Sequence, residues 1–456
     1  MMTTPNKPNN PHFFKKAARA IGRYGFTLLA PAMLATAAHA QDRTIALDEA
    51  IKLGLQNSKT LRLSQSKIDQ AVSQYNQAKD QSLPTGSVSY MYSYAWIPAN
   101  TLEFGGSVIG LPKTANANLG IASANEVLYA GGKYRYAKAS TDLLVQVARL
   151  DADKDKDQIA LDVVNEYYNL YKVLQNQKVV QQNLNSVDEQ IHQAQRFFEQ
   201  GLVTKNDVLR FQLQRSNIEL NGIDLENQRK IINYNLNILL GLPENTQLNV
   251  TQVVDVDRPI APLSNYLDTA LANRQEIKEL DLRTEAADYN VKSVRANQLP
   301  TLAATASGYY VGLTANPLPT HNNYITPITA GLALSWNFGS LWNNKNKVAE
   351  ARIQRDQTVI SKGITTDNIK TEVNQNYQNY LAALNRVRLL QTSIAQATEN
   401  NRITASRYSN ATASATDRAD AETLLYQAQT NLELARADAG LAYYNLLKST
   451  GRLNKQ

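Results

Sequence analysis

Hydrophobic positions recur with the alternating three- and four-residue spacing of a coiled coil in four long stretches of the chain. The first stretch, residues 133 to 198, contains no proline. At about 1.5 Å per residue it predicts a helix roughly 100 Å long. The return stretch begins near residue 205, and residues 345 to 408 and 417 to 447 repeat the pair. The recurring positions in the first pair are Ala160, Val164, Tyr167, Tyr171, Leu174, Val180, Leu184, Val187, Ile191, Ala194 and Phe198, then Leu209, Leu213, Ser216, Leu220 and Ile223.

Two other stretches alternate with a period of two, which predicts β-strands with one apolar face. The alternating residues are Tyr90, Tyr92, Tyr94 and Trp96 in one stretch and Ile328, Ala330, Leu332, Leu334, Trp336 and Phe338 in the other. Residues 119 to 129 and 302 to 313 show the pattern more weakly. Four strands of roughly ten residues are long enough to cross a bilayer at a tilt. Two hairpins of a soluble sheet would show the same period, but aromatic residues near the strand ends favour a lipid-facing sheet.

The chain contains an internal repeat. Leu55, Asn57, Ala71 and Leu83-Pro84-Thr85 are matched at a constant offset by Leu271, Asn273, Ala287 and Leu299-Pro300-Thr301. A duplicated unit explains this match better than two unrelated domains. The sequence therefore predicts a first repeat at 41–242 and a second at 263–447, each with a helix, two strands and two long helices. Residues 243–262 connect the repeats, and 448–456 form a C-terminal tail.

Residues 1–40 have the order of a secretory signal peptide: five basic residues and no acid, an apolar run, then Ala38-His39-Ala40 before Gln41. A membrane anchor is the alternative, although the run is short and contains Pro31. Because this segment holds most of the excess positive charge, the net charge of +7 gives no reason to expect a nucleic-acid partner. Any later membrane crossing must use strands, since no other window of 18 residues is continuously apolar.

The composition argues against an enzyme. Among 456 residues there are no cysteines and four histidines, which excludes disulfides, thiolate metal sites and cysteine nucleophiles. Glu189 and His192 have the spacing of a di-iron helix motif, but no second pair exists, so His192 is interpreted as an exposed helix residue. We expect no catalytic residue, cofactor or metal.

Four strands cannot close a barrel, and an open edge in hydrocarbon leaves backbone groups unpaired at several kcal/mol each. The smallest closed barrels have about eight strands. Several copies must therefore contribute strands to a shared barrel, and three copies give twelve. The sequence predicts an α+β membrane protein that assembles as a homotrimer.

The start of the second long helix in each repeat carries a recurrent motif. It reads Phe198, Gly201, Thr204 and Asp207-Val208-Leu209, then Tyr408, Ala411, Ser414 and Asp417-Arg418-Ala419-Asp420. With the order of elements after Gln41, this motif resembles the TolC family of trimeric outer-membrane channel proteins. The resemblance implies a twelve-stranded barrel in outer-membrane lipid, continued by an α-helical barrel through the periplasm. It also implies two partners, a periplasmic adaptor (membrane fusion) protein and an inner-membrane transporter of an efflux pump or type I secretion system. Since the chain lacks cysteine, it resembles the non-lipidated branch.

The same resemblance places Asp417 and Asp420 at the pore entrance, and Asp207 and Tyr408 in a latch that holds the entrance closed. The spacing of Asp207 and Asp417 after Thr204 and Ser414 also fits helix capping, which Asp420 does not. The arginine of the family latch is replaced by Ala413. Either fewer bonds hold this entrance, or Arg407 or Arg418 substitutes.

A trimeric envelope tether or adhesin remains the competing function, but a tether needs neither the duplicated hairpin nor an inward Asp pair. The sequence does not indicate the transported substrate.

Overall fold

The computed structural model describes residues 42–98, 101–110, 112–251, 260–316 and 323–453. The predicted signal peptide and its alternative, a membrane anchor, both lie outside these residues. Part of the predicted connection, 252–259, and the last three residues of the tail lie outside them as well.

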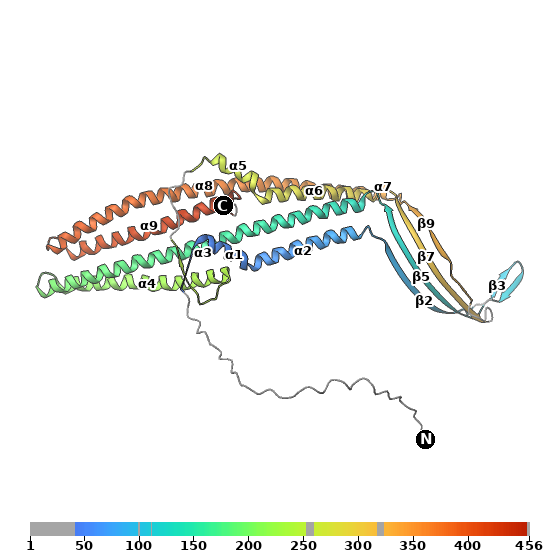
Figure 1. The fold of residues 1–456 in the computed structure, drawn as a ribbon, viewed down its shortest axis with the longest axis horizontal. Helices are drawn as coiled ribbons and strands as arrows, with labels where there is room; N and C mark the ends of the chain where they lie inside the picture. The colour runs from blue at the N-terminus through green and yellow to red at the C-terminus, as the bar shows by residue number, and fades with distance from the viewer. Residues whose placement is uncertain (1–41, 99–100, 111, 252–259, 317–322, 454–456) are drawn as a thin grey trace, which may run out of the picture. The chain divides into compact units, whose positions relative to one another are not determined.

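Four long helices occupy the four predicted stretches. They are α3 (Lys133–Glu199), α4 (Lys205–Leu240), α8 (Lys345–Ser409) and α9 (Ala415–Ser449). Figure 1 shows α3 and α8 running through the whole helical part, with α4 and α9 beside them at the end away from the strands. At the other end, α3 contacts α2 and α6, and α6 contacts α8. The alternating spacing thus predicted the existence and approximate extent of these helices.

The single helix expected before the strands of each repeat is two helices. The first repeat has α1 (Leu47–Asn57) and α2 (Lys59–Asp80), and the second has α5 (Leu263–Asn273) and α6 (Gln275–Ala296). One extended residue interrupts each pair, Ser58 with ψ 121° and Arg274 with ψ 126°. The Ser58 hydroxyl accepts a hydrogen bond from the Leu61 N–H at 3.2 Å and so caps α2. A short helix, α7 (Ser340–Asn343), precedes α8.

The predicted strands form one antiparallel sheet. Its strands are β2 (Thr85–Trp96), β5 (Thr114–Tyr129), β7 (Thr301–Asn316) and β9 (Ile328–Ser335), in the order β2-β5-β7-β9. A three-residue strand, β8 (Asn323–Ile325), also pairs with β7. The two repeats meet at the β5–β7 pair. Among the described residues β2 pairs only with β5 and β9 only with β7, so both strands are edges.

Two short strand pairs were not predicted. The hairpin of β3 (Thr101–Phe104) and β4 (Ser107–Gly110) turns at Gly105 and Gly106, whose φ angles of 58° and 82° suit a two-glycine turn. The second pair joins β1 (Asp42–Ile45) in parallel to β6 (Gln247–Val250), within the expected connection. All four of these strands are only four residues long, which is too short for a period to be recognised in the sequence.

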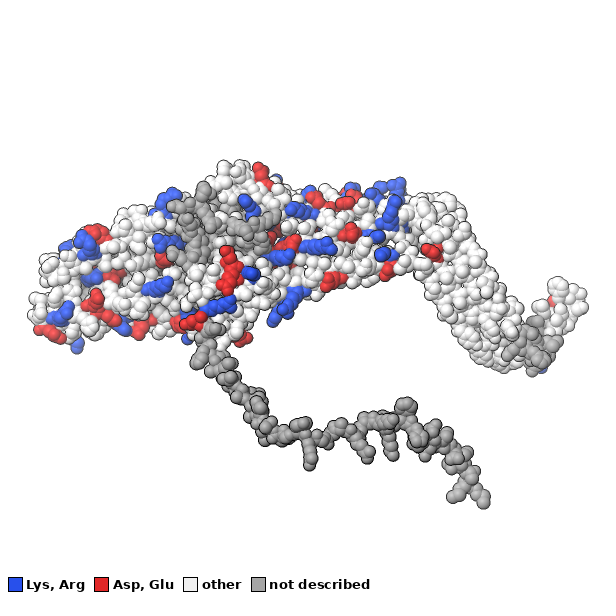
Figure 2. Space-filling model, in the orientation of Figure 1, with Lys and Arg blue, Asp and Glu red and all other residues white. Residues whose placement is uncertain are grey.

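The register of the sheet gives its two faces different chemistry. Tyr90 pairs with Gly120, Gly120 with Tyr310, and Ala304 with Leu332, so even-numbered residues of all four strands share one face. This even-numbered face carries the exposed aromatic and aliphatic side chains of β2 and β9. From Ala122 to Glu126 along β5 the even-numbered residues are exposed and the odd-numbered ones only half-exposed, as expected for a concave odd-numbered face. Figure 2 shows charged side chains scattered over the helices and almost none on the strands.

The helix α4 has two apolar faces, only one of which is buried. Val208, Phe211 and Ile218 are buried, whereas Leu213 is 64% exposed. The residues predicted from coiled-coil spacing therefore face outward within this chain. This exposed α4 stripe consists of Leu209, Leu213, Leu220, Ile223, Ile231, Tyr234 and Ile238.

The largest cluster of buried residues joins the two repeats at mid-length. Tyr167 and Tyr168 of α3 are fully buried there, beside Val163, Leu236 and Ala437. The Tyr167 hydroxyl donates to the Ile45 carbonyl at 3.0 Å and so ties β1 to α3. Helix α9 approaches Tyr168 so closely that a Cβ on Gly440 would lie 2.4 Å from the ring. Glycine at 440 is required by this contact.

We expect Gly440→Ala to destabilise the protein by about 1–3 kcal/mol, because the added methyl group overpacks a rigid buried ring. The matched control is Gly363→Ala, also inside a long helix, where an added Cβ meets nothing within 4 Å. That change should stabilise by about 0.5–1 kcal/mol, since alanine favours the helix. Thermal unfolding of the detergent-solubilised protein measures both changes. Equal shifts in the same direction would contradict the packing argument.

Candidate functional site at the helical tips

The candidate residues lie in the two turns that join the long helices in pairs. Both turns end the preceding helix in the same way. The Leu202 N–H donates to the Phe197 carbonyl at 2.8 Å, and the Thr412 N–H donates to the Arg407 carbonyl at 2.8 Å. This six-residue closure requires a left-handed residue, which is Gly201 with φ 74° in the first turn and Ala411 with φ 54° in the second. A left-handed conformation is unfavourable for alanine, so the second turn is strained.

A capping box begins α4 and α9. The backbone N–H and the hydroxyl of Thr204 both donate to Asp207 Oδ2 at 2.8 Å. The same two groups of Ser414 donate to Asp417 Oδ2 at 3.0 and 2.9 Å, and the Asp417 N–H donates back to the Ser414 hydroxyl at 3.1 Å. The capping role predicted from the spacing is confirmed for Asp207 and Asp417. The bonds from the Ser414 backbone and hydroxyl, with the nearby Arg407, lower the pKa of Asp417.

Tyr408 is the centre of a small apolar cluster at the tips, only 2% exposed. Its ring lies 5.7 Å from that of Phe197 and 6.0 Å from that of Phe211. Phe198, the residue that matches Tyr408 in the repeat, is instead 39% exposed. The sequence motif did not indicate the apolar partner of Tyr408, which is the neighbouring Phe197 of α3. The complete tip cluster contains Ala194, Val208, Phe211, Tyr408, Ala415 and Ala419, with Ile191, Phe197 and Ala413 against it.

Tyr408 lies close enough to Asp207 to feel its charge, but no bond between them forms within the described chain. Burial raises the pKa of the Tyr408 hydroxyl, and the negative charge of Asp207 raises it further. The buried hydroxyl oxygen has no hydrogen-bond partner among the described residues. A buried polar group without a hydrogen-bond partner destabilises a fold by roughly 1–3 kcal/mol. A partner that reached the Tyr408 hydroxyl would therefore be bound favourably.

Neither arginine considered as a substitute for the family latch residue is placed against Asp207. The Arg407 guanidinium donates to the Thr412 carbonyl of its own turn at 3.2 Å. Arg418 is buried, donates to Asn401 and forms an ion pair with Glu422 at 3.0 Å. At the position where the family has arginine, Ala413 packs against the tip cluster. This position therefore contributes to an apolar contact in this chain.

Asp417 and Asp420 are both exposed and lie one turn apart on α9. Residues at i and i+3 share a helix face, so the two carboxylates are neighbours. Asp420 makes no hydrogen bond or ion pair with the described residues that would hold it to its own chain. The exposed Asp420 carboxylate therefore faces solvent.

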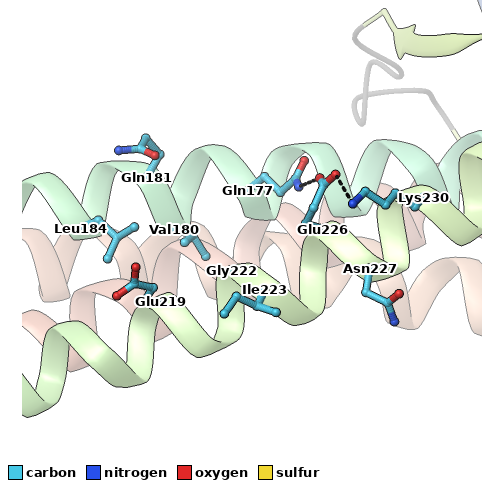
Figure 3. Close-up of a pocket in the computed structure, with 10 residues that line it drawn as sticks. All are labelled: Gln177, Val180, Gln181, Leu184, Glu219, Gly222, Ile223, Glu226, Asn227 and Lys230. Carbon is cyan, nitrogen blue, oxygen red and sulfur yellow. Dashed lines mark hydrogen bonds and ion pairs between the residues drawn. The ribbon is translucent and has the colours of Figure 1, made fainter. Parts of the chain in front are cut away.

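A groove between α3 and α4 was not anticipated from the sequence. It encloses about 480 Å³, and Figure 3 shows Gln177 and Lys230 turned toward Glu226. Bonds from Arg229 at 2.7 and 3.0 Å, and one from Gln177 at 3.0 Å, lower the pKa of Glu226 to about 2. Gly222 leaves the groove open, since its Cβ would lie 3.4 Å from Val180. Gly222, a glycine inside a long helical pattern, is the feature of the sequence that could have indicated this groove.

The described residues contain no group of three metal-ligating side chains. His192 is exposed, as expected. Among the described helices, none carries an apolar stretch long and uncharged enough to span a bilayer.

We expect Ala411→Gly to stabilise the protein by about 1 kcal/mol, because glycine adopts the left-handed conformation without strain. The reciprocal change, Gly201→Ala, should cost a similar amount in the equivalent turn. Denaturant unfolding of the two variants provides the test. If both changes shift the free energy of unfolding in the same direction, the strain assigned to Ala411 is wrong.

Comparison with known proteins agrees with this geometry. Residues 50–242 and 266–452 match the family described as outer membrane efflux protein. The chain is 24% identical over 336 residues to the outer membrane efflux protein BepC of Brucella suis, a match that covers 72% of this chain and 71% of BepC. It is 22% identical over 410 residues to the outer membrane protein TolC of Escherichia coli, covering 87% and 80%. The crystal structure of VceC from Vibrio cholerae superimposes with a TM-score of 0.73 at 16% identity, covering 89% of this chain and 96% of that one. The chain therefore belongs to the outer membrane efflux protein family, and its function is that of an outer-membrane exit channel for efflux.

Proposed function

We propose that three copies of the chain close into one duct that carries substrates from an inner-membrane transporter across the periplasm and the outer membrane. The observation that carries this proposal is the pair of unpaired sheet edges, β2 and β9, together with the exposed α4 stripe. Residues 1–40 act as the signal peptide and are removed before Gln41. A periplasmic adaptor and an inner-membrane transporter of an efflux pump or type I secretion system complete the assembly.

The sheet edges support closure through neighbouring copies. An unpaired strand in hydrocarbon loses several kcal/mol for each unsatisfied backbone group. Pairing β2 of one copy with β9 of the next satisfies both edges and gives a barrel of twelve strands from three chains. Because β2 and β9 carry their apolar side chains on the same even-numbered face, that face becomes the continuous outer surface of the barrel.

The helices support the same closure. The exposed α4 stripe has coiled-coil spacing, and such a stripe is stable in water only against a partner helix. Helix α8 packs on α9 and α6, and its other side exposes Ile353, Ile360 and Ile364 near the sheet and Leu389 and Ile403 toward the tip. In the closed ring, α8 of one copy lies against α2 and α4 of the next. The helices then enclose a tunnel.

The tips form the periplasmic entrance. Threefold symmetry brings Asp417 and Asp420 of three chains into two rings of carboxylates around the axis, where they attract cations. Tyr408 and Asp207 form the latch: the Tyr408 ring holds the two hairpins of one chain together through the tip cluster, and its unpaired hydroxyl lies within the electrostatic influence of Asp207. With Ala413 in place of arginine, this entrance closes through apolar contact and fewer bonds than the family pattern.

Mass measurement in mild detergent and conductance recording in a planar bilayer test the function directly. A trimer that conducts agrees with an exit duct. A trimer without conductance under conditions that open the entrance would favour the tether or adhesin, and a stable monomer with full strand content would refute barrel closure.

We expect Leu213→Glu combined with Leu220→Glu to dissociate the trimer, because two charges on the α4 stripe must be buried against the neighbouring copy. The control is Asn221→Glu, which adds a charge at an exposed polar position beside Leu220 but off the α4 stripe. The fraction of trimer after dilution in detergent is the measurement. If the control variant dissociates as readily as the double variant, added charge rather than stripe burial is responsible.

We expect Asp417→Asn combined with Asp420→Asn to reduce cation preference and to weaken block by multivalent cations, since six carboxylates near one axis are neutralised. Asparagine also caps helices, so the trimer should remain intact. Asp207→Ala is the contrasting variant and should raise the open fraction instead. Single-channel recordings separate these effects. Unchanged selectivity in an intact trimer of the double variant would leave capping as the only role of Asp417.

A further inference from the structure

The even-numbered face of the sheet changes its chemistry along the strands. Near the helices it carries Leu332 and Leu334, with Trp336 and Phe338 just beyond the end of β9. Farther out, Tyr90 and Tyr310 flank Gly120, and Tyr310 stacks on Tyr324 at 6.0 Å. The register pairs Ser335 with Thr301, nine residues before Tyr310. At about 2.5 Å of height per tilted residue, the two aromatic rows lie roughly 23 Å apart, close to the girdle spacing of an outer-membrane barrel.

A second group of side chains lies beyond the outer aromatic row, above the hydrocarbon layer. It comprises Tyr92, Tyr94 and Trp96 of β2 with Asn116 and Asn118 of β5, and we call it the outer platform. Its three aromatic side chains are 60, 61 and 72% exposed. These exposed rings lie about 5–15 Å past the level of Tyr90, which places them within and just beyond a headgroup layer roughly 5–8 Å thick.

Hydrogen bonds fix the geometry of the platform. The Tyr90 hydroxyl donates to Asn118 Oδ1 at 2.7 Å, and the Tyr92 hydroxyl donates to Asn116 Oδ1 at 3.0 Å. Each bond joins diagonal neighbours of the β2–β5 pair, which orients the tyrosine ring across the sheet. Each asparagine uses its oxygen in this way and retains an amide group that can donate. The rings and amides are therefore organised before any ligand binds.

The composition of the platform indicates what it can recognise. Strands β2, β5, β7, β8 and β9 contain a single charged residue, Glu126, near the helical end. Phosphate or carboxylate recognition uses arginine or lysine, which the even-numbered face of these strands lacks. The nearest lysine, Lys113, precedes β5 at an odd-numbered position and so lies off that face. Flat aromatic faces beside amide groups suit the C–H faces and hydroxyl groups of neutral sugars.

We propose that the outer platform binds neutral sugar residues in the headgroup of an outer-leaflet glycolipid. The proposal rests on the proposed function, which places the even-numbered face toward lipid. A second copy of the chain is a poorer occupant, because a neighbouring β9 adds to the edge of β2 and leaves the faces of β2 and β5 uncovered. The platform thus anchors the barrel at a fixed depth and favours membranes whose outer leaflet carries sugars.

The test uses the full-length trimer in detergent and counts bound lipids by native mass spectrometry. The probes are lipopolysaccharide with its core sugars, lipid A without core sugars, and phosphatidylglycerol. The wild-type protein should bind the core-bearing glycolipid about tenfold more tightly than lipid A, and Tyr94→Ala with Trp96→Ala should abolish this ratio. The control, Leu332→Ala with Leu334→Ala, removes apolar area from the same face at the level of the hydrocarbon and should preserve the ratio.

Two results would overturn the platform: equal binding of all three lipids by the wild-type protein, or an unchanged ratio in the Tyr94→Ala, Trp96→Ala variant. Mass and conductance of the same samples report on the channel separately. A conducting trimer without sugar preference refutes the platform and leaves the channel intact. Failure of the wild-type protein to form a conducting trimer refutes the proposed function itself.

Discussion

The unpaired backbone at the two edges of the sheet is the constraint on which the rest of the structure depends. β2 and β9 each have one partner in the described chain, and in hydrocarbon an unpaired edge is more costly than the loss of most side-chain contacts. A sheet with two unpaired edge strands therefore cannot satisfy its own backbone hydrogen bonds in lipid. The helices obey the same requirement in water, because the exposed α4 stripe has an apolar surface that a monomer cannot bury. In the proposed trimer, the same neighbouring copies would close both the sheet and the helical part.

The duplication of the sequence explains how one chain can serve both closures. The two repeats meet at the β5–β7 pair in the sheet and through contacts of α3 with α6 and α9 among the helices. Their tips nevertheless differ. Gly201 closes the first turn without strain while Ala411 strains the second, and Phe198 is exposed where its counterpart Tyr408 is buried. The repeat thus supplies the framework, and a few residue differences distinguish the two helical tips.

Periodicity allowed the long elements to be predicted, because a pattern of many residues averages over local exceptions. The bounds of α3 and α8 follow from it, and so do the four strands of the sheet. Short features escaped: β1, β3, β4 and β6 have four residues each, and the breaks at Ser58 and Arg274 occupy one residue. At the tips, spacing identified the capping roles of Asp207 and Asp417. It could not show which of two adjacent phenylalanines faces Tyr408, since that depends on how the helices are rotated against each other.

The contacts that α3 makes with α4 and with α9 differ in their chemistry. Toward α4 the buried part of the contact is apolar, with Val180, Val187 and Ile218 together. Two polar bonds add to this contact, from Gln177 to Glu226 and from Arg215 to Asp188. On the face that meets α9, Asn183 donates to Gln429 at 3.3 Å, and Asn176 and Gln190 lie seven residues away on either side. The side-chain oxygens of Asn176 and Gln190 have no hydrogen-bond partner among the described residues. Because buried polar groups without partners weaken a contact, these two oxygens reduce the stability of this stretch of the contact between the repeats. The apolar clusters that join the repeats lie on either side of this stretch, around Tyr168 at mid-length and around Tyr408 at the tips.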